Sequence, residues 1–236
     1  MGGYELLVDG RAVVVRESSR ARRMRLVVGP GRPPEVVVPV RSRRRTVEEF
    51  VHRNHDWLAA KMRVMAERPR ALPERPGSVW LAGEPVPLRH EPAGRPGVTP
   101  RDGHIEVRGT DLAATLERWY RQEARRRLVE AAEQYAPVLD VQVAAVSVRD
   151  QRTHWGSCSR QGRLSFSWRL VLAPPEVLTY VVVHELCHLR EFNHSPAFWR
   201  LVESVQPRWR DIAGWLRIHG HELHAYQPGG HGGDLG

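Results

Sequence analysis

Short apolar runs separated by turn-forming residues dominate the first part of this chain. Tyr4–Val8 and Ala12–Val15 flank Asp9-Gly10, a dipeptide that favours a two-residue hairpin turn. Runs of the same kind predict further strands over Met24–Val28, Val36–Val40, Val79–Leu81, Val86–Leu88 and His104–Val107. Residues 1–110 are therefore expected to form a β-rich N-terminal part.

One helix interrupts this β-rich part. The spacing of Thr46 and Glu49 is that of a capping box, and it predicts a helix from Thr46 to about Glu67. Trp57, Met62 and Met65 recur at helical spacing along it, so they are expected to belong to the core.

The second half of the chain mixes helical and strand patterns. Two strands are predicted, over Ala144–Val148 and Leu164–Trp168. Helices are predicted to begin near Asp111, Pro174-Pro175, Ser195-Pro196 and Pro207. The pattern indicates an α+β fold, with a catalytic part over residues 111–226 and a flexible Gly-rich tail over residues 227–236.

The helix after Pro174-Pro175 carries the chemistry. His184, Glu185 and His188 form an HExxH motif, and His194 follows six residues later. Residues four apart share one helical face, so His184 and His188 can bind one metal ion. A turn at Phe192-Asn193, with Asn in the left-handed region, is expected to bring His194 back as a third ligand. Three protein ligands and an open position for water are typical of catalytic zinc.

The composition adds limits. No stretch of the 236 residues is long and apolar enough to span a membrane, and a secretory segment is not expected, because residues near Met1 lack its apolar region. Cys158 and Cys187 are too few for a disulfide framework, so a cytoplasmic protein is expected.

The net charge of +9 comes almost wholly from arginine, because Lys61 is the only lysine. Richness in Arg, Ala, Pro, Gly and Val is typical of GC-rich coding, which raises the arginine content without a functional cause. Two arginine clusters suggest nucleic acid as a partner, although solvated strand and loop positions explain them as well. Their members are Arg16, Arg20, Arg22, Arg23 and Arg25, and then Arg41, Arg43, Arg44 and Arg45.

The residues around the motif resemble a known family. Trp155-Gly156-Ser157-Cys158, Tyr180–Leu189 and Asn193–Trp199 together look like the bacterial YgjP-type metal-dependent hydrolases, over about residues 16–220. That family is similar to the gluzincin-like metallopeptidases and to the catalytic domains of DNA–protein-crosslink proteases. The resemblance implies a zincin-like catalytic domain and a zinc hydrolase, but no particular substrate.

A metallopeptidase mechanism follows from this chemistry. Zinc lowers the pKa of its bound water, Glu185 accepts the proton, and the tetrahedral oxyanion needs one further donor. His154 and Tyr180 are the candidates for that donor. The strand with Ser165 and Ser167 is expected to bind a peptide or protein substrate as an edge strand beside the zinc helix.

Three alternatives remain open. Cys158 could replace His194 as the third ligand, as an upstream Cys does in peptide deformylases. The histidine spacing also matches that of rRNA-maturation endoribonucleases, which lack a carboxylate at the position of Glu185. A nucleic-acid-binding domain with a structural zinc would need a fourth ligand, for which Cys158 is the candidate.

Overall fold

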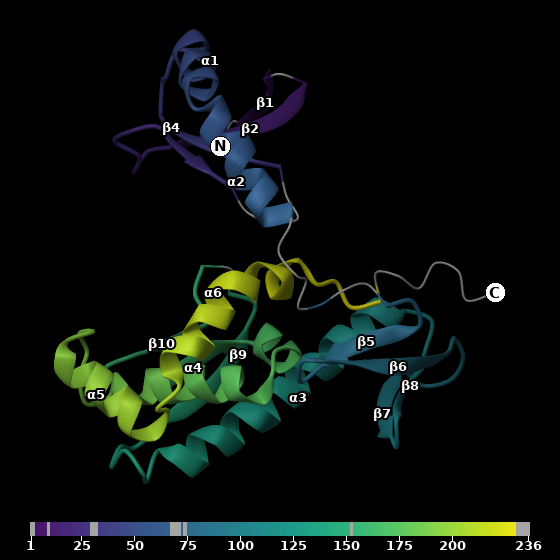
Figure 1. Cartoon of the computed structure of the whole chain (residues 1–236). Coiled ribbons are helices and arrows are strands. Elements are labelled where there is room, and N and C mark those ends of the chain that lie inside the picture. The colour runs from purple at the N-terminus through teal and green to yellow at the C-terminus, as the bar shows by residue number, and fades with distance from the viewer. Residues whose placement is uncertain are drawn as a thin grey trace. The chain divides into compact units, whose positions relative to one another are not determined.

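The structure, a computed structural model, describes residues 3–8, 10–28, 33–66, 72, 75–151 and 153–229 (Figure 1). The chain divides into two compact units, Met1–Arg70 and Ala71–Gly236.

A four-stranded sheet forms the base of the first unit. Its strands are β1 (Gly3–Val8), β2 (Arg11–Ser18), β3 (Arg25–Val27) and β4 (Glu35–Pro39), in the order β1-β2-β4-β3. β1 and β2 form the predicted antiparallel hairpin, and Gly10 adopts the positive φ of 74° that its turn requires. β2 runs parallel to β4, with Ser18 opposite Pro39 at their carboxyl ends.

Two helices complete the first unit where one was expected. α1 (Arg44–Arg53) and α2 (His55–Ala66) are separated at Asn54, whose side-chain amide donates to the carbonyl of Phe50. The predicted capping box is wrong, because α1 begins before Thr46 and its N-cap, Arg43, makes no capping hydrogen bond. Trp57 is also not a core residue, since 49% of it is exposed. Buried valines and leucines of both layers form the core instead: Leu6, Val8, Val13, Val15, Val36, Val38, Val47, Val51 and Leu58.

A second four-stranded sheet opens the second unit. It contains β5 (Ser78–Leu81), β6 (Glu84–Glu91), β7 (Gly97–Arg101) and β8 (His104–Arg108), in the order β5-β6-β8-β7. β7 was not predicted, because its GVTPR sequence has little apolar alternation and contains a proline.

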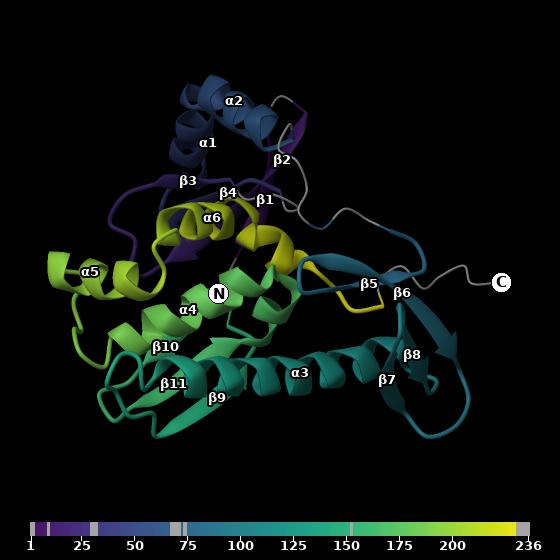
Figure 2. The same ribbon diagram turned by 60° about the horizontal axis from the view of Figure 1, so that its bottom comes forward.

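The long helix α3 (Leu112–Tyr135) joins this sheet to a third one. α3 begins near Asp111, as predicted, and Asp111 caps it by accepting from the backbone N–H of Ala114. The third sheet has the order β10-β11-β9 and comprises β9 (Ala145–Arg149), β10 (Gly156–Cys158) and β11 (Arg163–Ser167). Figure 2 shows α3 running past this sheet towards β7 and β8.

Three further helices follow in the second unit. After a 3₁₀ turn at Trp168–Leu172 come α4 (Pro175–Cys187), α5 (Pro196–Val205) and α6 (Trp209–Ala225). α4 begins after Pro174, and Ser195 caps α5 with Pro196 in its first turn, as the sequence predicts. α4 packs against α3, α5, α6 and β10, so it lies in the centre of the unit. Its apolar residues Val177, Val181, Val182, Val183 and Leu186 are buried.

The division between the units precedes β5, whereas the β-rich part was expected to extend to residue 110. β7 and β8 pack against α3, which ties residues 78–108 to the second unit. Of the expected tail, residues 230–236 lie outside the described part, while Gly229 lies beside Leu112 and Ala113. Among the described helices, none combines the length and apolar character that crossing a membrane requires.

Candidate active site

The end of α4 and the turn after it bring the three predicted histidines together. His184 is in the last turn of α4, and His188 is its C-cap residue. The turn starts at once, because the N–H groups of Arg190 and Glu191 both donate to the carbonyl of Cys187. Asn193 does not adopt the expected left-handed conformation, so that detail of the prediction is wrong.

The ligand atoms of His184, His188 and His194 all lie within 4.8 Å of one another. The Nε2 atoms of His184 and His194 are 3.1 Å apart. Two imidazoles bound to one tetrahedral metal, with bonds of about 2.0–2.1 Å, place their nitrogens roughly 3.4 Å apart. The spacing therefore fits a shared metal ion.

A backbone contact of His188 and the burial of His184 and His188 make these imidazoles suitable ligands. Nδ1 of His188 lies 3.2 Å from the carbonyl oxygen of Glu191. A carbonyl only accepts, so Nδ1 carries the proton and the Nε2 lone pair is free for a metal. Burial, together with His188 and His194, lowers the pKa of His184 to about 3, which keeps this imidazole neutral. Burial also lowers the pKa of His188.

Aromatic residues of α5 fix the orientation of these rings. The Phe198 ring centroid lies 4.9, 4.6 and 4.7 Å from those of His184, His188 and His194. Trp199 stacks on His194 at 5.6 Å and on Trp209 at 4.2 Å. Spacing along α5 alone does not show that Phe198 and Trp199 pack against the histidines, because these contacts join two different elements.

Glu185 follows His184 in α4 and is only 6% exposed. Burial raises the pKa of its carboxyl group to about 7. Gly156 of β10 lies against this side chain, since a Cβ atom at position 156 would come within 2.7 Å of both Cγ and Oε1 of Glu185. Only a glycine leaves room for the carboxyl group at its observed place.

A cleft of about 530 Å³ opens over these groups, and both candidate oxyanion donors line it. Tyr180 is buried in its wall, with its ring edge-on to His184 at 5.9 Å. Burial, followed by the charge of Glu185, raises the pKa of Tyr180 to about 12, so its hydroxyl stays protonated. His154 is exposed, and its Nδ1 lies 2.8 Å from Oγ1 of Thr153.

Cys158 also lines the cleft but does not join the histidines. Among the described residues, the group that could hold a metal contains the three histidines and not Cys158. Its thiol lies 3.4 Å from the carbonyl of Ser159, and burial raises its pKa to about 11. Because the thiol does not converge with the three histidines, neither the deformylase-like site nor a fourth structural ligand is favoured.

The expected substrate strand is not an edge strand. β11 lies between β10 and β9, so both of its edges are already paired. Ser167 is fully buried, and its hydroxyl accepts from the N–H of Arg169. Ser165 accepts from the side-chain amide of Gln151. The proposed substrate-binding role of Ser165 and Ser167 on an edge strand is therefore wrong. β10, next to α4, is at the edge instead.

Trp155, just before β10, is held by α6. Its ring stacks on His224 at 4.0 Å, and a Cβ atom at position 220 would come within 2.8 Å of it. Gly220 therefore lets Trp155 lie flat against the helix. α6 thus supports the segment that places Gly156 beside Glu185.

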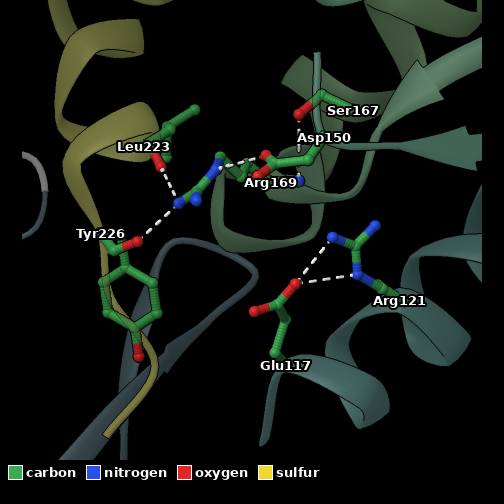
Figure 3. A network of polar contacts seen from close by, with 7 residues as sticks. All are labelled: Glu117, Arg121, Asp150, Ser167, Arg169, Leu223 and Tyr226. Atoms are coloured by element: carbon green, nitrogen blue, oxygen red, sulfur yellow. Dashed lines mark hydrogen bonds and ion pairs between the residues drawn. The ribbon is translucent and has the colours of Figure 1, made fainter. Parts of the chain in front are cut away.

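A buried arginine anchors the end of α6 (Figure 3). Arg169 donates to the carbonyl oxygens of Leu223 and Tyr226 at 3.0 and 2.5 Å, and to Asp150 at 3.0 Å. Its guanidinium also lies 4.4 Å from the ring centroid of Trp168. Leu223 belongs to the last turn of α6, where carbonyl groups lack helical partners, so Arg169 satisfies them. Sequence reasoning missed this residue, because one arginine among 35 carries no local signal.

Comparisons with known proteins bear on the family of the chain. One solved structure with similarity is the crystal structure of the metallopeptidase zymogen of Pyrococcus abyssi abylysin, at 26% identity and a TM-score of 0.36, covering 38% of this chain and 90% of that one. No curated protein sequence matches the chain significantly. The family model described as YgjP-like, metallopeptidase domain matches residues 22–219, which include every residue of the cleft. The chain therefore belongs to the YgjP-like family of metallopeptidase domains.

Proposed function

We propose that the chain is a zinc-dependent peptidase that cleaves peptide bonds with water activated by Glu185. The convergence of three imidazole nitrogens within 4.8 Å, beside a buried carboxyl group and inside an open cleft, carries this proposal. Membership of a metallopeptidase family supports a metal-dependent peptidase.

Zinc is the metal that suits this donor set. Neutral imidazoles are good zinc ligands, and a site with three protein ligands keeps a fourth position for water, as catalytic zinc sites do. When bound there, zinc would supply Lewis acidity and lower the pKa of the water to about 7.

Glu185 is proposed to be the general base. It follows His184 directly, and its carboxyl group is packed against Gly156 next to the histidines. From this place it can accept a proton from the attacking water and return it to the leaving amine. Because position 156 has no side chain, the carboxyl group can occupy this place without a clash with β10.

Tyr180 and His154 are proposed as donors to the developing oxyanion. A buried, protonated phenol in the cleft wall can donate without reorganisation, which supports Tyr180. His154 lies exposed at the cleft, where it could also meet the substrate main chain.

The substrate is proposed to be an extended peptide paired with β10. β10 forms one edge of its sheet, and Gly156, Ser157 and Cys158 all line the cleft. A strand added to this edge would run alongside the three histidines through main-chain hydrogen bonds.

The test compares wild type with Glu185→Gln on a fluorogenic peptide library and on labelled RNA, with zinc per chain measured in parallel. The amide has the shape of the carboxylate but cannot accept a proton, so peptidase activity should fall by about 10²–10⁴-fold at unchanged metal content. Peptidase activity at the wild-type level in Glu185→Gln would contradict the proposal. A metal-dependent RNase activity that survives the substitution would favour the nuclease alternative.

A further inference from the structure

The positive charge of the protein is concentrated in the first compact unit. Residues 1–70 contain 16 Lys and Arg against 8 Asp and Glu, a formal charge of +8. Residues 71–236 contain 20 Lys and Arg against 19 Asp and Glu, a charge of +1. Nearly the whole excess therefore belongs to the unit that does not contain the candidate active site.

This distribution argues against coding bias as the cause. A bias towards arginine codons acts on the whole chain, and the second unit has balanced its 20 arginines with acidic residues. The first unit has not balanced its own, although it is less than half as long. The like charges of a small domain with a net charge of +8 repel one another and destabilise its compact state. An anionic partner would neutralise these charges, and this favours a binding role for them.

The strand topology gathers six arginines at one end of the sheet. β2 and β4 are parallel neighbours whose last residues, Ser18 and Pro39, pair directly. The segments that follow these two residues therefore start side by side. The backbone turns at once in both, as Ala21 N–H donates to Ser18 and Ser42 N–H to Pro39. We call the arginines of these segments and of the adjoining start of β3 the arginine edge: Arg20, Arg22, Arg23, Arg25, Arg41 and Arg43.

All six side chains of the arginine edge are exposed, and none forms an ion pair with another described residue. Neighbouring arginines do have partners, since Arg16 pairs with Glu35, Arg44 with Glu48 and Arg45 with Glu49. Arg41 even adopts a positive φ of 68°, which is unfavourable for a residue with a Cβ atom. As far as the described residues go, the edge thus presents guanidinium groups without an acidic partner, and such groups suit bidentate contact with phosphate.

We propose that the first unit binds double-stranded nucleic acid through phosphate contacts made by the arginine edge. Neither segment of the edge contains an aromatic residue, so base stacking, on which single-strand binding relies, is absent from it. Val40 is the one large apolar side chain in these segments with half of its surface exposed, which is too little for insertion into a membrane. The arginine edge is therefore expected to contact the phosphates of a duplex and not its bases, so that binding does not depend on the base sequence.

This inference does not depend on the proposed peptidase activity, because it concerns the other unit. If all six arginines contact phosphates, the logarithm of the binding constant should fall with the logarithm of salt concentration at a slope of about −5. Removal of two of them should reduce that slope by about 2 and weaken binding about tenfold or more at low salt.

The test is fluorescence anisotropy of the full chain with labelled duplex DNA and duplex RNA of scrambled sequence, titrated at several salt concentrations. Single strands and vesicles with anionic lipid are the comparison probes. Arg22→Gln/Arg23→Gln is the test variant. Arg118→Gln/Arg217→Gln is the control, because it removes the same charge from two exposed arginines of the second unit.

A steep salt dependence that weakens in Arg22→Gln/Arg23→Gln, and not in the control, is expected. Absence of duplex binding, equal losses in the two variants, or a preference for single strands or vesicles over duplexes would overturn the inference. Peptidase activity measured on the same samples separates the two proposals. If wild type binds duplexes but has no peptidase activity, the proposed peptidase function is contradicted and duplex binding is not. If wild type has peptidase activity but does not bind duplexes, only the duplex-binding inference is contradicted.

Discussion

The close approach of Gly156 to Glu185 predicts that the smallest possible side chain at position 156 will impair catalysis. A Cβ atom added there would lie 2.7 Å from Cγ and Oε1 of Glu185 and 2.9 Å from Cδ. Gly156 does not have the positive φ that makes other residues unfavourable, so alanine fits its backbone. The effect of Gly156→Ala should therefore come from the contact with Glu185.

The size of the effect follows from these distances. Ordinary van der Waals contact begins at 3.4 Å, so the carboxyl group must move by about 0.7 Å. Glu185 is 6% exposed and cannot move without disturbing its neighbours. Displacement of a catalytic group by about 1 Å can cost on the order of 10²-fold in rate, and we expect a loss of that size in kcat/KM.

The assay is kcat/KM on a peptide substrate, with metal content and urea-induced unfolding measured on the same preparations. Gly214→Ala is the matched control, because it makes the same substitution in α6 where a Cβ atom meets nothing within 4 Å. The control should keep wild-type activity and gain up to about 1 kcal/mol in unfolding free energy, as alanine favours a helix. Wild-type kcat/KM in Gly156→Ala would refute the reasoning, and so would a loss fully explained by lost metal.

Two further predictions concern the surroundings of the site. Arg169→Met should lower the free energy of unfolding by about 3 kcal/mol in a urea titration, because Asp150 and the carbonyls at the end of α6 lose their partner; a loss below about 1 kcal/mol would contradict the anchoring role. Alkylation of Cys158 by iodoacetamide in chelator-treated protein should be about a hundredfold slower at pH 8 than for an unhindered thiol, and should accelerate as the pH rises towards its pKa of about 11. A rate like that of a free thiol at pH 8 would mean that Cys158 is not desolvated.

Local patterns predicted most of the helices and strands. The hairpin at Gly10, the start of α3 near Asp111, the cap of α5 and the proline start of α4 rely on neighbours in the sequence, and all are confirmed. The helix predicted from Thr46 differs from the structure at both ends. It begins earlier, after Arg43, and it is interrupted at Asn54, which separates α1 from α2. Trp57 was expected to be buried from periodicity alone, yet the turn at Asn54 changes which face of α2 meets the core.

The residues of the candidate site also fall into two groups: those that local sequence spacing predicts and those that it does not. The α4 pattern was sufficient to select His184, Glu185, His188 and His194, because helical spacing and one short turn connect them. The roles of Gly156, Gly220 and Arg169 depend on contacts between segments distant in sequence. Strand order in a sheet is equally non-local, and for that reason β11 was mistaken for the edge that β10 occupies.

The most direct test of the account is the amount of zinc per chain in untagged protein, by elemental mass spectrometry on wild type, His194→Ala and His154→Ala. His194 belongs to the group of three converging ligands, while His154 lines the same cleft outside that group. Near one zinc in wild type and His154→Ala, with a clear loss in His194→Ala, is the predicted result. Equal zinc in wild type and His194→Ala would contradict the three-histidine site.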